Sequence, residues 1–467
     1  MQTRLQFYLA SFGSIMDVVM LSRIQFAMTS MFHYIYPPLS IGLGLYLVMI
    51  EGMYIKTKNP LYLQMTKFWV KIFALTFALG VATGMVQIFG FGTNWANYSR
   101  FVGDVFGSAL GAEGIFAFFL EAGFVGIMLF GWKKVSAKIH YFSTICVAIG
   151  AHFSAIWIVV ANSWMQTPAG FKIVGSGAKA RAVVTDFWGM IFNPSSVDRL
   201  IHVIIGCWLA GSFLIISISA YYLLKQKYLD FAHKSMKIAI TFASIFLILQ
   251  LISADASGRR VAEYQPSKLA ALEGVYQTKE YTPMTLIGWV DEKTRSVKGI
   301  QIPGLLSFLV YRHFKTPVTG LDTIPQNEQP PVRIVFQTYH MMIYMWGLMV
   351  LGAFTTLISF RRNSLQNKKW LLRFLVLSVG FPQIANMSGW MTTEIGRQPW
   401  VVWKILRTTH GVSPNIVAGQ VLGSIIMLAT IYFFLLAVFL FLLDRKIKQG
   451  PLEEFDVAAT YKEKTGG

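Results

Sequence analysis

A carboxylate and a guanidinium stand close together near the end of an apolar run. Glu394 and Arg397 are three residues apart, so they can face each other on a helical turn. Trp390 and a second tryptophan bracket the pair, as amphipathic rings do at the headgroup level of a membrane. Pro399 cannot continue a helix, because it lacks a backbone donor. Two interpretations have equal weight: an interfacial salt bridge, or a Glu394 that acts on a cofactor held between helices.

Other polar side chains lie inside apolar runs, where each ionisable group costs at least about 2.5–3.5 kcal/mol and is a functional candidate. The ionisable candidates are His33, Glu113, Glu121 and His202, and the thioether of Met342 is considered with them. On one helix, the eight residues from Glu113 to Glu121 span about 12 Å and 80°, so both can line one inner stripe. Alternatives stay open: a membrane histidine often bonds a neighbouring helix, a methionine often packs a core, and paired glutamates can relay protons, bind an ion or clamp helices.

The composition excludes an ordinary soluble protein. Of 467 residues, 54% are hydrophobic and 13% are charged, and the mean hydropathy is +0.52. Such a chain is predicted to be an all-α polytopic membrane protein, because lipid cannot satisfy unpaired backbone groups. The net charge of +19 does not indicate nucleic acid, since the basic residues concentrate in short loops between apolar runs. Cys146 and Cys207 lie in apolar runs and are interpreted as small core residues.

We expect about nine transmembrane helices. They are predicted near 24–50, 68–90, 108–131, 139–162, 200–224, 236–254, 333–359, 371–391 and 417–443. This divides the chain into helices 1–6 (1–254), one long connecting loop (255–332), and helices 7–9 with a short tail (333–467). Residues 1–20 form a moderately apolar lead-in without a clear cleavage site.

Alternate loops carry the lysines and arginines, which orients the chain. The positive-inside rule places the N-terminus outside, the C-terminus in the cytoplasm and the loop 255–332 outside. In this topology five of the candidates share the outer half of the membrane: His33, Glu113, His202, Met342 and Glu394. Their common depth favours one connected site.

Histidine, methionine and carboxylate together suit iron in a porphyrin. A His–Met pair gives a closed haem for electron transfer, and one strong axial ligand leaves a position open for a gas. A heme-copper oxidase needs adjacent histidines on a span, and the sequence has none. The cytochrome b of quinol–cytochrome c reductases needs two spans with two histidines each, whereas only His140 and His152 share a predicted helix here.

From about Leu21 to Pro451 the chain resembles subunit I of the cytochrome bd quinol oxidases, in its short quinol-loop form. The motifs that carry this resemblance are Leu21–Ala27, Phe91–Trp95, Ala117–Glu121, Val160–Gln166 and Gly389–Trp400. The family pairs this chain with a second large membrane subunit, subunit II, and in some relatives with a small single-span subunit.

The resemblance implies three haems. His202 and Met342 would be the axial ligands of a low-spin haem b. His33 and Glu394 would each serve one of two high-spin haems: a high-spin haem b, and an oxygen-reducing haem d or a further haem b, with His33 favoured for haem d. The cofactor site would also include Trp390.

Three other residues take roles from the resemblance. Glu113 would lie beside the oxygen-reducing haem, and Glu121 would continue a proton path from the cytoplasm. Asn162 and Ser154 are candidate further waypoints, and polar contacts between helices explain these two residues equally well. Arg397 would neutralise a haem propionate or Glu394.

The resemblance also marks the segment Gln265–Glu273 as quinol-binding, with Lys268 and Glu273 meeting the quinol hydroxyls. Without the resemblance, the ordinary interpretation of this segment is an amphipathic helix with solvated charges. Near Met342 some relatives have arginine where this chain has His340, and the adjacent Met341 is an alternative ligand.

The implied function is a quinol:oxygen oxidoreductase of the prokaryotic cell membrane, which reduces O2 to water with cytoplasmic protons. A competing hypothesis is a haem-free proton-coupled membrane transporter using the two glutamates. That class predicts internal repeats and broken helices near the midplane, and we find no such repeat in the sequence. A third is a structural subunit without haem.

Overall fold

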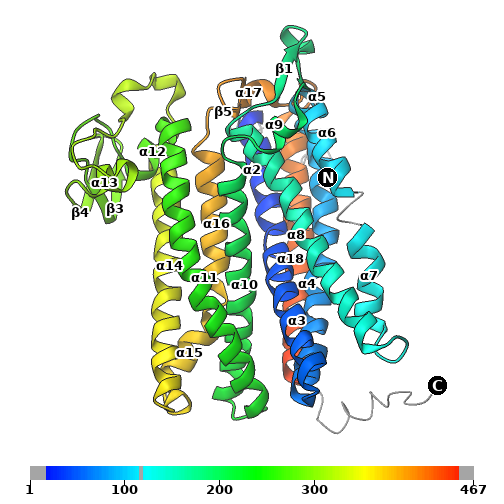
Figure 1. Cartoon of the computed structure of the whole chain (residues 1–467). Helices are drawn as coiled ribbons and strands as arrows, with labels where there is room; N and C mark the ends of the chain where they lie inside the picture. The colour runs from blue at the N-terminus through cyan, green and yellow to red at the C-terminus, as the bar shows by residue number, and fades with distance from the viewer. Residues whose placement is uncertain (1–16, 115–118, 452–467) are drawn as a thin grey trace, which may run out of the picture.

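The computed structural model describes residues 17–114 and 119–451, which form a bundle of long helices (Figure 1). Eight helical segments in this described part are long and apolar enough to cross a membrane, which confirms the all-α prediction. They are Val18–Thr57 (α2 and α3), Pro60–Thr93 (α4), Ala137–Gln166 (α8), Ser196–Leu224 (α10), Leu229–Tyr264 (α11), Val332–Arg361 (α14), Lys369–Ile395 (α15 and α16) and Ala418–Gln449 (α18).

The remaining predicted span, 108–131, is only partly described. It covers the end of α6 (Gly103–Ala112), residues 115–118, which lie outside the described residues, and α7 (Phe119–Phe130). Glu113 is the C-cap residue of α6, whereas Glu121 lies in the first turn of α7. A single helix carrying both glutamates therefore stays a prediction.

The first predicted span, 24–50, lies within the candidate span Val18–Thr57, which starts earlier and contains a break that the sequence did not predict. The helix α2 (Val18–His33) begins earlier and ends at His33, and α3 (Pro37–Thr57) begins with two prolines. Proline suits the first turn of a helix, where its missing N–H is not needed, but it cannot continue a preceding helix. The break leaves His33 at a helix end inside the membrane span. A second break separates α15 (Lys369–Leu377) from α16 (Gly380–Ile395).

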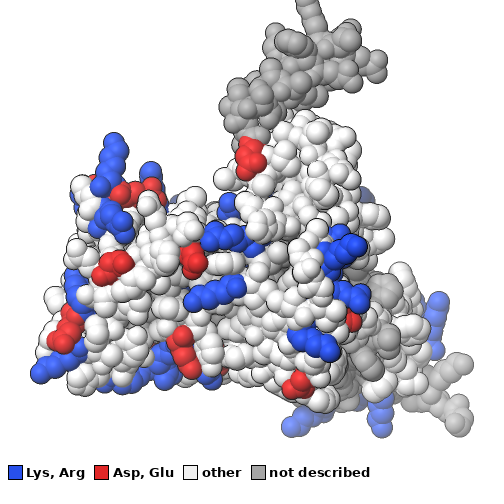
Figure 2. All heavy atoms as spheres, turned by 90° about the horizontal axis from the view of Figure 1, so that it is seen from above, with Lys and Arg blue, Asp and Glu red and all other residues white. Residues whose placement is uncertain are grey.

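Short elements cover one end of the bundle, and apart from a helix in the segment Gln265–Glu273 the sequence did not predict their structure. Three two-stranded antiparallel sheets lie there: β1 (Phe171–Val174) with β2 (Arg181–Val184), β3 (Met284–Asp291) with β4 (Ser296–Ile302), and β5 (Trp400–Val402) with β6 (Leu406–Arg407). The short helices with them are α5 (Ala96–Phe101), α9 (Phe187–Ile191), α12 (Pro266–Glu273), α13 (Leu305–Tyr311) and α17 (Thr408–Gly411). Seen from this end, Lys and Arg side chains are interspersed with Asp and Glu (Figure 2).

The main core joins the long helices α3, α4, α10 and α11 around aromatic side chains such as Trp69 and Phe231. The helices α3 and α10 approach closely at two glycines: a Cβ added at Gly42 would lie 2.7 Å from the Cα of Gly211. The close approach therefore depends on the absence of a side chain at Gly42. A separate small core holds α12 and the β3–β4 hairpin against α14. The covering end is therefore packed onto the bundle at the level of the predicted site.

Candidate functional site

Polar side chains from four parts of the chain meet below the covering end. We call this group the Glu394 cluster; its members are Asn162, Gln166, Arg199, Lys268, Glu394 and Arg397. They come from the end of α8, the start of α10, the short helix α12 and the end of α16. The cluster brings together Asn162, Lys268 and the pair of Glu394 and Arg397, which the sequence singled out separately.

Glu394 and Arg397 form the predicted ion pair across the last turn of α16. Arg397 is only 2% exposed, so the pair is not a solvated bridge at the surface. Its Nε donates to the carbonyl of Trp400 at 3.3 Å, and its buried Nη1 has no partner among the described residues. A buried guanidinium with an unused donor is suited to a further anionic group.

The helix α8 supplies amides to the other carboxylate oxygen. Asn162 Nδ2 and Gln166 Nε2 donate to Glu394 Oε1 at 2.9 and 3.4 Å. Arg199 donates to Oδ1 of Asn162, and its buried Nε has no partner among the described residues. Sequence reasoning missed Arg199, although an arginine at the start of an apolar run is the kind of signal that could have found it.

Lys268 joins the predicted quinol segment to this cluster. Its amine donates to the side-chain oxygens of Gln166 and Gln265, and only 3% of Lys268 is exposed. Burial lowers the pKa of Lys268 well below its ordinary value, and the nearby Arg199 and Arg397 lower it further. The interpretation of this segment as a helix with solvated charges is therefore wrong.

Glu273 lies at the other end of α12, only 4% exposed. Burial raises the pKa of Glu273 to about 7, and a hydrogen bond from Tyr339 opposes this rise. Its Oε2 has no partner among the described residues. A carboxyl group in such a site can change its protonation state near neutral pH.

His33 is held by a threonine on α4. The Thr83 hydroxyl donates to the carbonyl of Leu79 at 2.7 Å, so it can accept a hydrogen bond from His33 Nδ1, 3.0 Å away. This arrangement puts the proton on Nδ1 and leaves Nε2 as the nitrogen available to a metal. The imidazole faces Gly84, where a Cβ would lie 3.1 Å from Cε1 of the ring.

Trp390 connects the surroundings of His33 with those of Glu394. Its ring contacts the ring of Tyr34 edge to face, with centroids 5.5 Å apart. Tyr34 follows His33 directly, and Trp390 precedes Glu394 by about one helical turn. The two predicted high-spin ligands therefore lie in adjoining parts of the bundle.

His202 and Met342 have separate contacts. His202 Nδ1 lies 3.3 Å from the Ser253 hydroxyl, and Gln250 Nε2 lies 3.0 Å from His202 Nε2. Met342 faces α16, where a Cβ at Gly389 would lie 3.1 Å from its sulfur. The adjacent Met341 is 41% exposed. No contact among the described residues joins His202 to Met342.

The glutamates of the predicted proton path have contacts separate from the Glu394 cluster. Ser154 Oγ donates to Glu113 Oε1 at 2.6 Å, and Glu121 is buried within electrostatic reach of Glu113. Asn162 belongs to the Glu394 cluster instead. The predicted waypoints thus divide between two groups.

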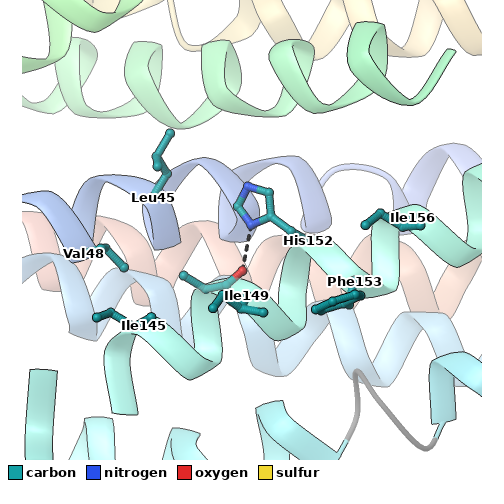
Figure 3. Close-up of a pocket in the computed structure, with 8 residues that line it drawn as sticks. Leu45, Val48, Ile145, Ile149, His152, Phe153 and Ile156 are labelled. Carbon is teal, nitrogen blue, oxygen red and sulfur yellow. Dashed lines mark hydrogen bonds between the residues drawn. The ribbon is translucent and has the colours of Figure 1, made fainter. Parts of the chain in front are cut away.

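The two histidines of α8 have both ring nitrogens engaged. His140 contacts Glu51 Oε1 at 2.6 Å and the carbonyl of Met128 at 3.0 Å. His152 contacts the carbonyl of Ala148 at 2.7 Å and accepts from Trp208 Nε1 at 2.9 Å. His152 lines a hollow of about 250 Å³ whose other walls are apolar (Figure 3). These contacts explain both residues as interhelical hydrogen-bonding histidines.

The sequence and the structure match one family. The model of the family "Cytochrome bd terminal oxidase subunit I" matches residues 21–451. The chain is 40% identical to cytochrome bd ubiquinol oxidase subunit 1 of Bacillus subtilis (strain 168), over 93% of this chain and 94% of the relative. It is 32% identical to cytochrome bd-II ubiquinol oxidase subunit 1 of Escherichia coli (strain K12), over 93% and 97%. The solved bd oxidase from Geobacillus thermodenitrificans superimposes with a TM-score of 0.87 and 31% identity, covering 93% of this chain and 99% of that one.

Proposed function

The chain belongs to the cytochrome bd terminal oxidase subunit I family, and we propose that it oxidises quinol beside α12 and passes the electrons through three haems to O2. It is a bd-type quinol oxidase subunit and a multi-pass membrane protein. The observation that carries the proposed route is the hydrogen-bonded link from Lys268 through Gln166 to Glu394. This link makes the quinol segment and a predicted haem ligand parts of one buried network.

The residues present fit the haems that we assign to them. His202 and Met342 would hold a low-spin haem b. His33 and Glu394 would hold the two high-spin haems, a haem b and a haem d or further haem b. Thr83 leaves a nitrogen of His33 available to iron. When bound, the haems would supply one-electron carriers and an iron that is open to O2.

The cationic part of the cluster suits the propionates of such groups. Arg397 and Arg199 each keep a buried nitrogen that has no partner in the described part of the chain, and guanidinium groups bind carboxylates strongly. At the low-spin site, the contact of Gln250 with His202 Nε2 must be given up for that nitrogen to bind iron.

On the quinol side, the two ends of α12 have different roles. Glu273 accepts a proton from a quinol hydroxyl, because its raised pKa lies near neutral pH. Lys268 orients the quinol by donating hydrogen bonds from a fixed amine. The loop 255–332 that carries both residues then faces the outside of the cell, so the released protons leave there.

Protons for water come from the cytoplasm in this proposal. Glu121, Glu113 and Ser154 form the path across α7, α6 and α8. Moving each charge through the membrane field is worth about 2.3 kcal/mol per 100 mV, so the transfer is electrogenic without a pump.

The proposed orientation puts the N-terminus outside and the C-terminus in the cytoplasm. The Lys- and Arg-rich loops lie at the opposite end of the bundle from the β hairpins, which supports this orientation (Figure 1). The proposed partner is subunit II of the oxidase, with a small single-span subunit as a further one. The helix α18 exposes large apolar side chains such as Phe433 and Phe441, which suit lipid or a partner helix.

A reduced-minus-oxidised absorption spectrum of the purified complex tests the proposal. A band beyond about 600 nm supports haem d, and bands of b type alone support a third haem b. A spectrum without haem bands would support the transporter or the structural subunit instead. His202→Ala should remove the low-spin haem absorption and leave the bands of the oxygen site, so surviving low-spin absorption would contradict the assignment.

A further inference from the structure

The β3–β4 hairpin has one packed face and one exposed face. The exposed face is apolar at the end far from the turn, and nearer the turn it carries Lys298, which lies opposite Trp289 and pairs with Asp291 at 3.0 Å. Val290 is 5% exposed and packs in the small core with α12 and α14. On the other face, Ile287 pairs with Ile300 across the hairpin, and these side chains are 59% and 63% exposed. Trp289 on the same face is 65% exposed. An exposed apolar face of this kind marks an interaction surface.

Three hydrogen bonds fix the hairpin alongside the membrane-spanning helix α14. The carbonyl of Thr285 accepts from His340 Nε2 at 2.9 Å, and the carbonyl of Gly288 accepts from Gln337 Nε2 at 3.2 Å. Further along, Glu292 Oε1 accepts from the backbone N–H of Arg333 at 3.4 Å. The strand β3 therefore runs antiparallel to α14, and its first residues lie furthest from the start of that helix. Figure 1 shows the hairpin beside α14.

The depth can be judged from the length of α14. Its 30 residues span about 45 Å, close to the thickness of a bilayer including both headgroup layers. Each headgroup layer is then about 5–8 Å thick. Arg333 is the second residue of α14, and His340 lies seven residues, or about 10 Å, further along the helix toward the membrane interior. The start of β3 thus reaches the boundary between headgroups and acyl chains.

The polarity of the hairpin follows the same direction. Its deep end carries Ile287, Ile300 and Ile302, whereas the turn beside Arg333 carries charged residues such as Glu292. Trp289 lies between the two, as tryptophan does at membrane interfaces. A change from apolar to charged side chains along the membrane normal is expected for a surface that contacts lipid, and not for a surface that contacts only water or a soluble partner.

We propose that the exposed face of the β3–β4 hairpin is immersed in the bilayer leaflet on the side of the loop 255–332, with lipid as its occupant. The hairpin also packs against α12: a Cβ at Gly274, the residue after Glu273, would lie 2.3 Å from Val297 of β4. The lipid contact is therefore one strand away from the predicted quinol segment. This inference does not depend on the proposed function, since it concerns the position of the hairpin alone.

Site-specific fluorescence in nanodiscs tests the proposal on the whole complex. Ile287→Cys carries an environment-sensitive label at the deep end, Ile300→Cys repeats the position from the paired strand, and Thr294→Cys in the turn is the matched control. The native Cys146 and Cys207 are buried, and the unsubstituted complex measures their background labelling.

A spin-labelled phosphatidylcholine should remove most of the emission at positions 287 and 300 and little at position 294, and iodide in the buffer should do the reverse. Iodide quenching at both deep positions would show that the face lies in water and would overturn the proposal. Protection from both quenchers there would show that a protein surface covers the face, which also overturns it.

Discussion

The two ends of the short helix α12 bury opposite charges in contrasting surroundings. Lys268 donates hydrogen bonds to two side-chain amides and lies near Arg199, Arg397 and Glu394, so its amine is part of a polar cluster. Glu273 has a carboxylate oxygen without a partner among the described residues. Burial disfavours the charged form of both groups: it lowers the pKa of Lys268 well below its ordinary value and raises the pKa of Glu273 to about 7. This difference supports the proposal that Lys268 positions the quinol and Glu273 takes up its proton.

The largest effect is expected from Glu273→Gln. The amide keeps the shape of the side chain but cannot accept a proton, and general-base catalysis is typically worth about 10²–10⁴-fold in rate. Steady-state quinol oxidation should therefore lose at least about 10²-fold in kcat. The matched control is Glu263→Gln at the end of α11, whose side chain is 58% exposed. Equal activity of both variants would remove Glu273 from the reaction.

The pH dependence of the unsubstituted enzyme should report the same group. The carboxylate form is the base, and burial raises the pKa of Glu273 to about 7. Below that pH the group is protonated and cannot take up a proton, so kcat/KM should rise as pH increases through about 7. In Glu273→Gln this rise of kcat/KM with pH should be absent. If kcat/KM of the variant still rises through about pH 7, the titrating group is not Glu273.

A smaller effect is expected from Lys268→Met, which keeps the length of the side chain and removes its hydrogen bonds. A hydrogen bond to a charged group is worth about 1.5–3 kcal/mol, so the quinol KM should rise about tenfold or more. The variant should change KM more than kcat, because the amine positions the quinol. Lys293→Met in the exposed turn of the hairpin is the control. A KM unchanged from the unsubstituted enzyme would contradict the role of Lys268.

The sequence predicted part of the fold and of the candidate site, and the rest could not be predicted from it. The apolar runs and their spacing predicted the helical membrane fold, and the three-residue spacing of Glu394 and Arg397 predicted their pairing. The burial of Lys268 could not be predicted from α12, because it depends on Gln166, about a hundred residues away. The two prolines after His33 indicate a break in the helix, but the apolar run continues through them, so the sequence analysis assigned one continuous span.

Gly274→Ala tests how firmly the Glu273 end is fixed. Gly274 ends α12 with φ of 66°, and a Cβ there would lie 2.3 Å from Val297. Strain and overpacking should cost about 1–3 kcal/mol and lower the melting temperature of the complex. Gly258→Ala on α11 is the matched control, since a Cβ there meets nothing within 4 Å. Equal melting temperatures for the two variants would contradict the close packing at Gly274.

The smallest effect is expected from Arg312→Gln, which breaks an ion pair at the surface of the same loop. Arg312 and Arg259 both pair with Asp255, and these side chains are 46%, 46% and 27% exposed. Exposed pairs are worth about 0–1 kcal/mol, and Asp255 keeps Arg259 as a partner. The melting temperature should therefore stay close to that of the unsubstituted complex, with an unchanged quinol KM. A large change in either would mean that exposed charges of the loop also hold the site, and that burial alone does not distinguish α12.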